Sequence, residues 1–180
     1  MSKPQFELLA TYNYHMNQKI CGSIKGLPEE DLWQDKKAFF GSILGTLNHL
    51  MVGDLIWLTR FNQNPNYPNG FNALQGLTDF DQPTGLNQKL CQSQTDYIAR
   101  RLALDEIIIG FIEALTEEDL SQALTYTNTK GVSFNRPFSQ LLLHLFNHQT
   151  HHRGQVTTLL NQIGIDIGET DLLMLIDDIN

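Results

Sequence analysis

The sequence predicts an all-α protein, more narrowly a four-helix bundle with a long connection between its second and third helices. Apolar residues recur at three- and four-residue steps in four long segments, which is the period of an amphipathic helix. Turn-forming residues crowd between the second and third of these segments. A short acidic motif also occurs twice, once after the first segment and once after the third. The 180 residues suit one domain with a sizeable core, so we expect residues 1–180 to form a single domain.

The first two predicted helices cover residues 5–25 and 39–61. The apolar stripe of the first consists of Phe6, Leu9, Met16, Ile20 and Ile24. That helix is expected to end at Gly26-Leu27-Pro28, because glycine closes a helix C-terminus and proline cannot continue it. The second helix is apolar nearly all round, which predicts that it is deeply buried.

The long connection covers residues 62–87 and precedes a third helix at residues 90–115. It contains Asn-Pro-Asn-Tyr-Pro-Asn-Gly and Asp-Gln-Pro-Thr-Gly, which are strong turn sequences. Its aromatic residues predict that it packs on the bundle, namely Tyr67, Phe71 and Phe80. Loops of this length are usually functional or disordered, so two interpretations stand: a crossover connection, or a cover over a pocket.

The repeated motif reads Leu27-Pro-Glu-Glu-Asp-Leu in one copy and Leu115-Thr-Glu-Glu-Asp-Leu in the other. Each copy precedes a helix that carries an Asn-His pair, Asn48-His49 or Asn147-His148. Acidic residues are also ordinary at helix N-termini, so the motif by itself is weak. Together with the Asn-His pairs, it favours two similar helical hairpins and hence a four-helix bundle.

The fourth helix is predicted over residues 138–163, with Asn135 as its cap and Pro137 in its first turn. It holds the run His-Gln-Thr-His-His-Arg-Gly-Gln, which is the most informative stretch of the chain. At 100° per residue, His152 falls within about 20° of the centre of the apolar stripe and His148 within about 60°. These two side chains are therefore expected to point into the bundle.

The other two histidines of this helix, His144 and His151, lie about 100–120° from the stripe, at its edge or outside it. A single inward histidine is usually a satisfied core residue. Two on one buried face are harder to accommodate, because each ring nitrogen needs a partner. Since residues four apart can hold one ion, we predict that His148 and His152 are metal ligands.

A third ligand is needed, and His49 on the second helix is the best remaining candidate. Small residues surround it at helical spacing, which leaves room for an ion: Ser42, Gly45, Thr46 and Gly53. The opposite face of that helix is the more apolar one, so the periodicity alone leaves the role of His49 open.

Other catalytic motifs do not occur in the sequence. It has no Glu-x-x-His pair of the di-iron bundles, no glycine-rich phosphate loop, no Gly-x-Ser-x-Gly elbow and no paired-cysteine zinc motif. The two cysteines, Cys21 and Cys91, stand alone and far apart, which fits a reducing cytoplasm. No residue can be singled out as a general acid or base, so the catalytic residues stay unassigned.

Charge and hydropathy limit the partners. The formal net charge is −8 and no basic stripe occurs, so we expect no nucleic-acid partner. No apolar run is long enough to span a membrane, and the first residues lack the blocks of a signal peptide. We therefore expect a cytoplasmic protein without a membrane association.

Three motifs in this order resemble the DinB-like (DinB/YfiT) family of bacterial four-helix-bundle metalloproteins. They are Tyr12-Asn13, Leu47-Asn48-His49-Leu50, and His148-x-x-x-His152-Arg153-Gly154-Gln155. The resemblance spans nearly the whole chain, and the last motif is its most specific part. It implies a metal triad of His49, His148 and His152, a bound nickel or zinc ion, and a homodimer.

The resemblance also implies a class of function, since some relatives are transferases or isomerases that use low-molecular-weight thiols. We therefore expect a metal-dependent enzyme acting on a small-molecule substrate, as a thiol-dependent transferase or a hydrolase. The alternative is a non-catalytic bundle whose metal is structural or vestigial. With unperturbed imidazoles, the site is expected to lose its metal below about pH 6.

Overall fold

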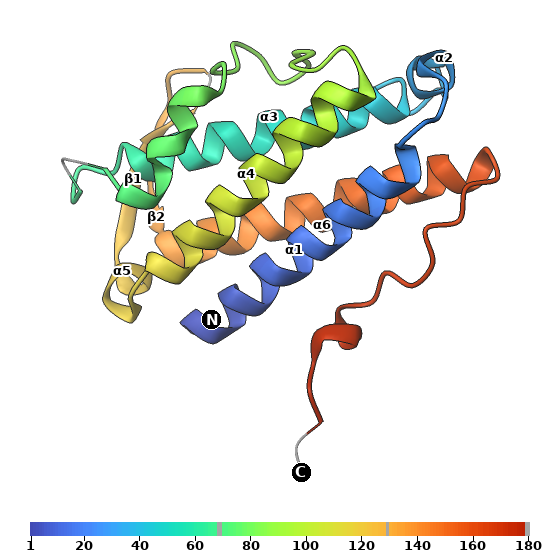
Figure 1. The fold of residues 1–180 in the computed structure, drawn as a ribbon. Coiled ribbons are helices and arrows are strands. Elements are labelled where there is room, and N and C mark those ends of the chain that lie inside the picture. The colour runs from blue at the N-terminus through green and yellow to red at the C-terminus, as the bar shows by residue number, and fades with distance from the viewer. Residues whose placement is uncertain (68–69, 129, 179–180) are drawn as a thin grey trace.

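The computed structural model describes residues 1–67, 70–128 and 130–178, and four long helices dominate it (Figure 1). The helix α1 packs mainly on α4, and α3 packs mainly on α6. The prediction of an all-α four-helix bundle is confirmed, with a small two-stranded sheet added to it. The bounds of the four long helices are α1 Lys3–Ile24, α3 Ile43–Asn62, α4 Gln94–Ala114 and α6 Phe138–Gln162.

Serine side chains fix the starts of two of these helices. The Ser42 hydroxyl accepts a hydrogen bond from the Gly45 amide at 3.0 Å, and α3 begins just after it. The Ser93 hydroxyl caps α4 in the same way, accepting from the Asp96 amide at 3.2 Å. Both helices therefore start a few residues later than predicted, because the sequence pattern of apolar residues runs on past the caps.

Residues 36–41 form a turn where the sequence predicts the start of the second helix. The Gly41 amide donates to the Ala38 carbonyl at 2.8 Å, and the Lys36 amide donates to the Gly41 carbonyl at 2.7 Å. Gly41 has a φ of +77°, a conformation that glycine adopts without strain. The turn places Phe39 and Phe40 before the helix rather than inside it.

The repeated acidic motif forms two short helices, α2 (Glu29–Trp33) and α5 (Glu117–Ser121), at opposite ends of the bundle (Figure 1). Each buries one leucine, Leu32 in α2 and Leu120 in α5. Their acidic side chains lie in the first turn, where they interact favourably with the helix dipole.

A β-hairpin precedes α6, and the sequence analysis missed it. Strands β1 (Ala123–Thr127) and β2 (Ser133–Pro137) pair antiparallel, with Thr125 opposite Asn135. The prediction that Asn135 caps the last helix is therefore wrong, because Asn135 lies within β2. Pro137 ends that strand, and the Phe138 amide donates to the Gln122 carbonyl at 2.9 Å as α6 begins.

The long connection packs on the bundle, as its aromatic residues predict. Its middle forms a 3-10 helix, η1 (Asn72–Asp79), against α4 and α3, and Leu74 and Leu77 are buried there. Phe71 packs edge-to-face on Phe111 of α4, with ring centroids 5.1 Å apart. The segment is thus part of the folded body in its described residues.

A buried polar network joins all four long helices at the centre of the bundle. Arg101 of α4 donates to Asp54 of α3 at 2.6 Å and to Asp105, one turn further along α4, at 2.7 Å. Asn13 of α1 donates to Asp105 at 3.0 Å and accepts from Arg153 of α6. Two arginines and two aspartates therefore balance in charge, and every one of them is buried.

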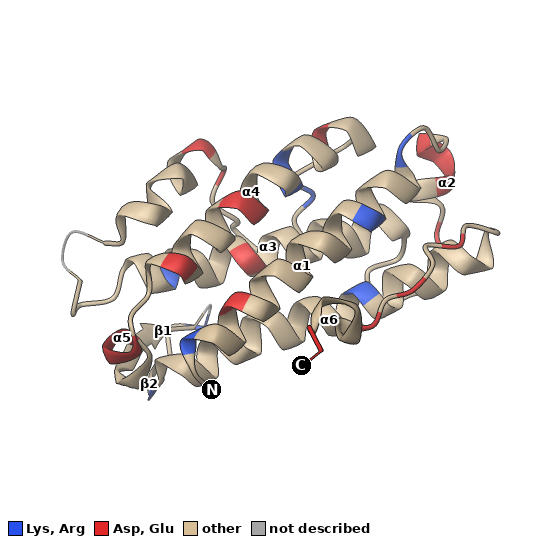
Figure 2. Cartoon of the chain, turned by 60° about the horizontal axis from the view of Figure 1, so that its bottom comes forward, with Lys and Arg blue, Asp and Glu red and all other residues tan. Residues whose placement is uncertain are grey.

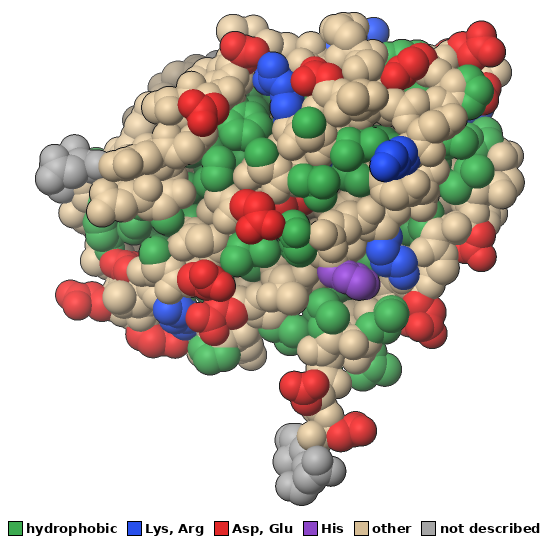
Figure 3. Space-filling view, viewed as in Figure 1, with side chains coloured by type: hydrophobic (Ala, Val, Ile, Leu, Met, Phe, Trp, Pro, Cys, Tyr) green, Lys and Arg blue, Asp and Glu red, His purple; other side chains and the backbone are tan. Residues whose placement is uncertain are grey.

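The chain leaves the bundle after α6 and runs back across α1, ending in a short 3-10 helix, η2 (Leu172–Leu175). The Tyr12 hydroxyl donates to the Thr170 carbonyl at 2.6 Å, and beyond this point the segment projects from the body (Figure 3). Acidic residues cluster on α2, on α5 and along this segment, whereas basic residues are scattered (Figure 2). Among the described residues, no helix has the length and apolar character needed to cross a membrane.

Candidate metal centre

The three histidines predicted as ligands lie together between α3 and α6. His49 comes from the second turn of α3, whereas His148 and His152 lie one helical turn apart on α6. One ring nitrogen from each can be chosen so that all three lie within 4.8 Å of one another. The packing of α3 on α6 brings together residues that are 99 positions apart in the sequence.

The rings face one another closely. The Nε2 atoms of His49 and His148 are 3.1 Å apart. The ring centroid of His152 lies 4.7 Å from that of His49 and 4.4 Å from that of His148. Phe40 stacks on the His49 ring at a centroid distance of 3.8 Å, so the turn before α3 covers one side of the cluster.

Two of the three rings are held by hydrogen bonds that define their tautomers. The Nδ1 atom of His49 lies 3.0 Å from the carbonyl oxygen of Leu86, which can only accept, so this nitrogen carries the proton. The Nδ1 atom of His152 likewise donates to Oε1 of Gln155 at 2.7 Å. Both Nε2 atoms therefore keep a free lone pair, which is the form in which imidazole binds a metal.

His148 is packed against the backbone of α3. A Cβ atom added to Gly53 would lie only 2.8 Å from Cε1 of His148, so glycine is the residue that leaves room for this ring. Its Nδ1 atom is buried and has no hydrogen-bond partner among the described residues. A ring so placed is not a satisfied core histidine.

The cluster is kept uncharged by its surroundings. Burial, and after it repulsion from the charges of neighbouring histidines, lowers the pKa of His148 to about 3. Burial also lowers the pKa of His49 and that of His152. All three imidazoles are therefore neutral near pH 7, and none has to lose a proton before it coordinates.

These observations fit a divalent transition metal. Two imidazole nitrogens on one tetrahedral ion, each about 2.0–2.1 Å from it, lie about 3.3 Å apart, close to the 3.1 Å between His49 and His148. Histidines that bind a metal usually donate their other ring N–H to a carbonyl or carboxylate oxygen, as His49 donates to Leu86 and His152 to Gln155. Neutral nitrogen donors suit several metals, so the donor set alone does not select one.

The remaining histidines of α6 stay outside the cluster, as their helical angles predict. His144 is exposed and packs on Trp57, with ring centroids 5.2 Å apart. His151 is exposed and lies beside His152. Both cysteines are buried away from the cluster, and burial raises the pKa of each thiol to about 12, so they are held as neutral thiols.

A cavity of about 570 Å³ opens beside the cluster. Two of the three histidines form part of its wall, His49 and His152, and Gln155 lies next to them. The end of the long connection contributes Leu86 and Asn87. The sequence allows two interpretations of residues 62–87, a crossover connection or a cover over a pocket, and each interpretation applies to a different part. The helix η1 packs into the core, whereas the end of the connection borders the site.

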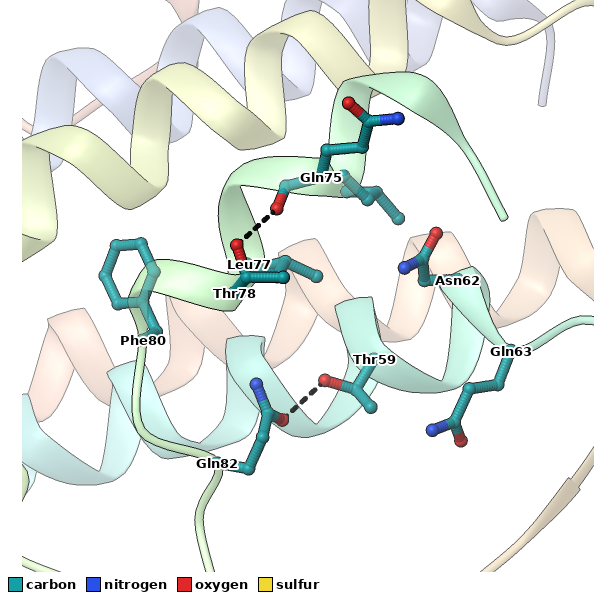
Figure 4. A pocket seen from close by; sticks show the side chains of 9 residues that line it. Thr59, Asn62, Gln63, Gln75, Leu77, Thr78, Phe80 and Gln82 are labelled. Carbon is teal, nitrogen blue, oxygen red and sulfur yellow. Dashed lines mark hydrogen bonds between the residues drawn. The ribbon is translucent and has the colours of Figure 1, made fainter. Parts of the chain in front are cut away.

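A second cavity, of about 630 Å³, lies between α3 and η1 (Figure 4). Hydroxyl, amide and apolar side chains line it, and Thr59 donates to Gln82 across it at 2.7 Å. None of its described lining residues is titratable, and none belongs to the histidine cluster. The smaller cavity, which borders the histidines, is therefore the better candidate for a reactive site.

Sequence reasoning missed two parts of the site. Phe39 and Phe40 were expected within a helix, yet they form part of the cavity wall. The carbonyl of Leu86 carries no side-chain signal that a sequence could reveal. The helical angle of Gln155 allows a position at the site or at a solvated rim. In the structure Gln155 lies at the site, where its Oε1 atom accepts a hydrogen bond from His152.

Comparison with known proteins agrees with these observations. The family model described as the DinB family matches residues 1–178. The curated protein named Protein DinB of Bacillus subtilis (strain 168) is 31% identical over 163 residues, which cover 91% of this chain and 88% of that protein. No solved structure matches. From its motifs, its helical bundle and the match along nearly its full length, this chain belongs to the DinB family.

Proposed function

We propose that this protein is a metal-dependent enzyme whose zinc or nickel ion is held by His49, His148 and His152. One observation supports the proposal above all: three neutral imidazoles converge at the wall of a cavity large enough for a small molecule. A divalent ion with an open position would lower the pKa of a bound water or thiol and so supply a nucleophile near neutral pH.

The protein's own side chains support this use of the site. Leu86 and Gln155 hold the rings of His49 and His152 with their Nε2 atoms free. Phe40 stacks on His49 and limits the access of water from that side. Neither His144 nor His151 belongs to the group of three among the described residues, and the cavity beside the group has room for a substrate.

The reaction we propose is the transfer of a sulfur nucleophile from a low-molecular-weight thiol to a small electrophile, with hydrolysis as the second candidate. The rival function is a bundle in which the metal is only structural. A structural ion needs a closed set of ligands, whereas the group in the described residues has three. The homodimer stays a prediction, which sedimentation analysis of the purified protein would test.

The proposal is tested by loading the protein with cobalt(II), whose visible spectrum reports coordination. We expect one ion per chain, a tetrahedral-type spectrum, and a change in that spectrum when a thiol is added. The His151→Ala variant is the matched control for metal binding, because His151 is outside the group of three, and it should bind one cobalt ion like the parent protein. An ion that binds but ignores every added thiol and anion would identify the closed, structural site instead.

Elemental analysis of protein purified without a nickel column would then identify the native metal. The activity is sought by following thiol addition to an activated aryl chloride and the hydrolysis of an activated ester, for loaded, metal-free and His152→Ala protein. Equal rates in all three samples would contradict a metal-dependent enzyme.

A further inference from the structure

The cavity beside the histidine cluster has an unusual wall. Besides His49 and His152, the wall consists of apolar and polar side chains: Phe39, Phe40, Leu86, Asn87, His151 and Gln155. No lysine, arginine, aspartate or glutamate is among the described residues that line it. A charged group buried in this space would therefore meet no lysine, arginine or carboxylate side chain of the wall.

The lysines near this end of the bundle are directed elsewhere. The ammonium group of Lys89 lies 4.3 Å from the centre of the Trp33 ring, and Lys89 lines a neighbouring cavity that also borders Phe39, Phe40 and Asn87. Lys37 pairs with Asp35, and Lys36 donates to Gln34. Each of these three lysines has a partner of its own, and none of them lines the cavity beside the histidine cluster.

Phe39 is the most exposed large apolar residue of the described chain, with 87% of its surface accessible. It is not a loose side chain on a mobile tip, because the hydrogen-bonded turn at residues 36–41 holds it. Lys37 adopts a φ of +59° in that turn, a conformation that costs energy for a residue with a side chain. The turn beside the cavity therefore contains both a strained residue, Lys37, and an exposed aromatic ring, that of Phe39.

From these observations we propose that the metal centre takes a substrate with an uncharged aromatic or similarly flat apolar body, which packs on Phe39 and Phe40. This inference rests on the proposed function and specifies its substrate class. The reacting atom can be anionic, because it would face the metal, whereas the body of the substrate meets no lysine, arginine, aspartate or glutamate of the described wall. Phe39 is the specificity-determining residue, since Phe40 already stacks on His49.

Three thiols of matched design test this on the cobalt-loaded protein, with the cobalt–thiolate absorption as the measure of binding. Benzyl mercaptan carries the ring, 4-(mercaptomethyl)benzoate adds a carboxylate to it, and ethanethiol lacks the ring. We expect benzyl mercaptan to bind about tenfold more tightly than either of the other two. In the Phe39→Ala variant, its advantage over ethanethiol should shrink several-fold, with the affinity for ethanethiol unchanged.

Val132→Ala, which alters an exposed apolar residue on the hairpin, is the control and should leave all three affinities as they are. Because Phe39 is exposed, its replacement should not affect folding, which circular dichroism would verify. Equal affinities for the three thiols, or tighter binding of the carboxylate, would overturn this inference and leave the proposed function standing. Cobalt binding without any thiol response would instead count against the proposed function itself.

Discussion

The bundle buries two polar clusters, and they differ in how completely their members are paired. In the network around Arg101, each charged group meets an opposite charge or an amide. In the histidine cluster, the Nε2 atoms of His49 and His148 lie 3.1 Å apart, and the Nδ1 atom of His148 has no partner in the part of the chain that the structure describes. The network is complete within the chain and is explained by its role in the structure. The histidine cluster, in contrast, leaves the Nε2 atoms of His49 and His152 unprotonated and available to a ligand from outside the chain.

The two clusters also differ in their access to solvent. Both side chains of the Arg101–Asp54 ion pair have no exposed surface. The histidine cluster borders a cavity. Among its members, His49 is buried, whereas His148 and His152 are only partly buried. A change in the network should therefore appear as lost stability, whereas a change in the cluster should appear as lost metal binding. The following predictions test that division.

The largest effect is expected for His148→Ala, which removes the central ligand. Tight metal binding should be lost, because two imidazoles remain where at least three protein ligands are needed. The metal-free variant should unfold at a urea concentration similar to that of the metal-free parent. The reason is that the His148 ring buries a nitrogen without a hydrogen-bond partner among the described residues, and this cost offsets what its packing contributes. Calorimetric titration with zinc measures the first effect. Binding by this variant as tight as in His151→Ala would mean that the ligand set is wrong.

Arg101→Met should have the largest effect on stability. Removing this guanidinium leaves Asp54 and Asp105 buried without their cation, which is expected to cost about 3–5 kcal/mol in the free energy of unfolding. Urea denaturation of the metal-free protein measures it. Arg100→Met is the matched control, because Arg100 pairs with partly exposed Asp96 and should cost under about 1 kcal/mol. Similar losses in the two variants would contradict the role given to the network.

Gly53→Ala connects the two regions, because Gly53 lies on α3 between His49 and Asp54, and the three atoms nearest to an added Cβ all belong to His148. The added methyl group would meet Cε1 of His148 and displace the ring, so we expect metal affinity to fall by about 10–100-fold. The unfolding free energy should change little. Gly154→Ala on α6 meets nothing within 4 Å and serves as the control, with metal affinity retained. An unchanged affinity for zinc in both variants would show that the ring is not held by this contact.

The smallest effect concerns pH. Sequence reasoning with ordinary imidazoles predicts metal loss below about pH 6. Burial lowers the pKa of all three rings, so protons compete for the nitrogens only at lower pH, and the release of zinc should begin below about pH 6. Zinc release and the helical circular dichroism signal are followed together as the pH falls. Release at pH 6 or above from a folded protein would argue against the lowered pKa values.

Sequence periodicity was sufficient for the helices and for the inward pair on α6, because both depend on a repeat that a single sequence displays. It could not determine where α3 begins, since Phe39 and Phe40 fit an apolar helix as well as they fit a turn. The hairpin before α6 was missed because its strands are short and mostly exposed.

One member of the buried network around Arg101 could have been recognised from the sequence. Asp54 stands in a helix that is otherwise apolar nearly all round, and a lone carboxylate in such a helix needs a cation from another element. The partner itself, Arg101, could not be chosen from the sequence, because that depends on how α3 packs on α4. The same holds for Leu86, whose contribution is a backbone oxygen.

That backbone oxygen links the metal to the protein's resistance to proteases. The Leu86 carbonyl holds the His49 ring at the end of a connection that otherwise bears many turn residues. When an ion fixes the ring, the ring fixes this stretch of chain in return. Cleavage within residues 81–89 should therefore be slow in the loaded protein and faster after chelation, and the rate of cutting would report how much of the protein in a sample carries its ion.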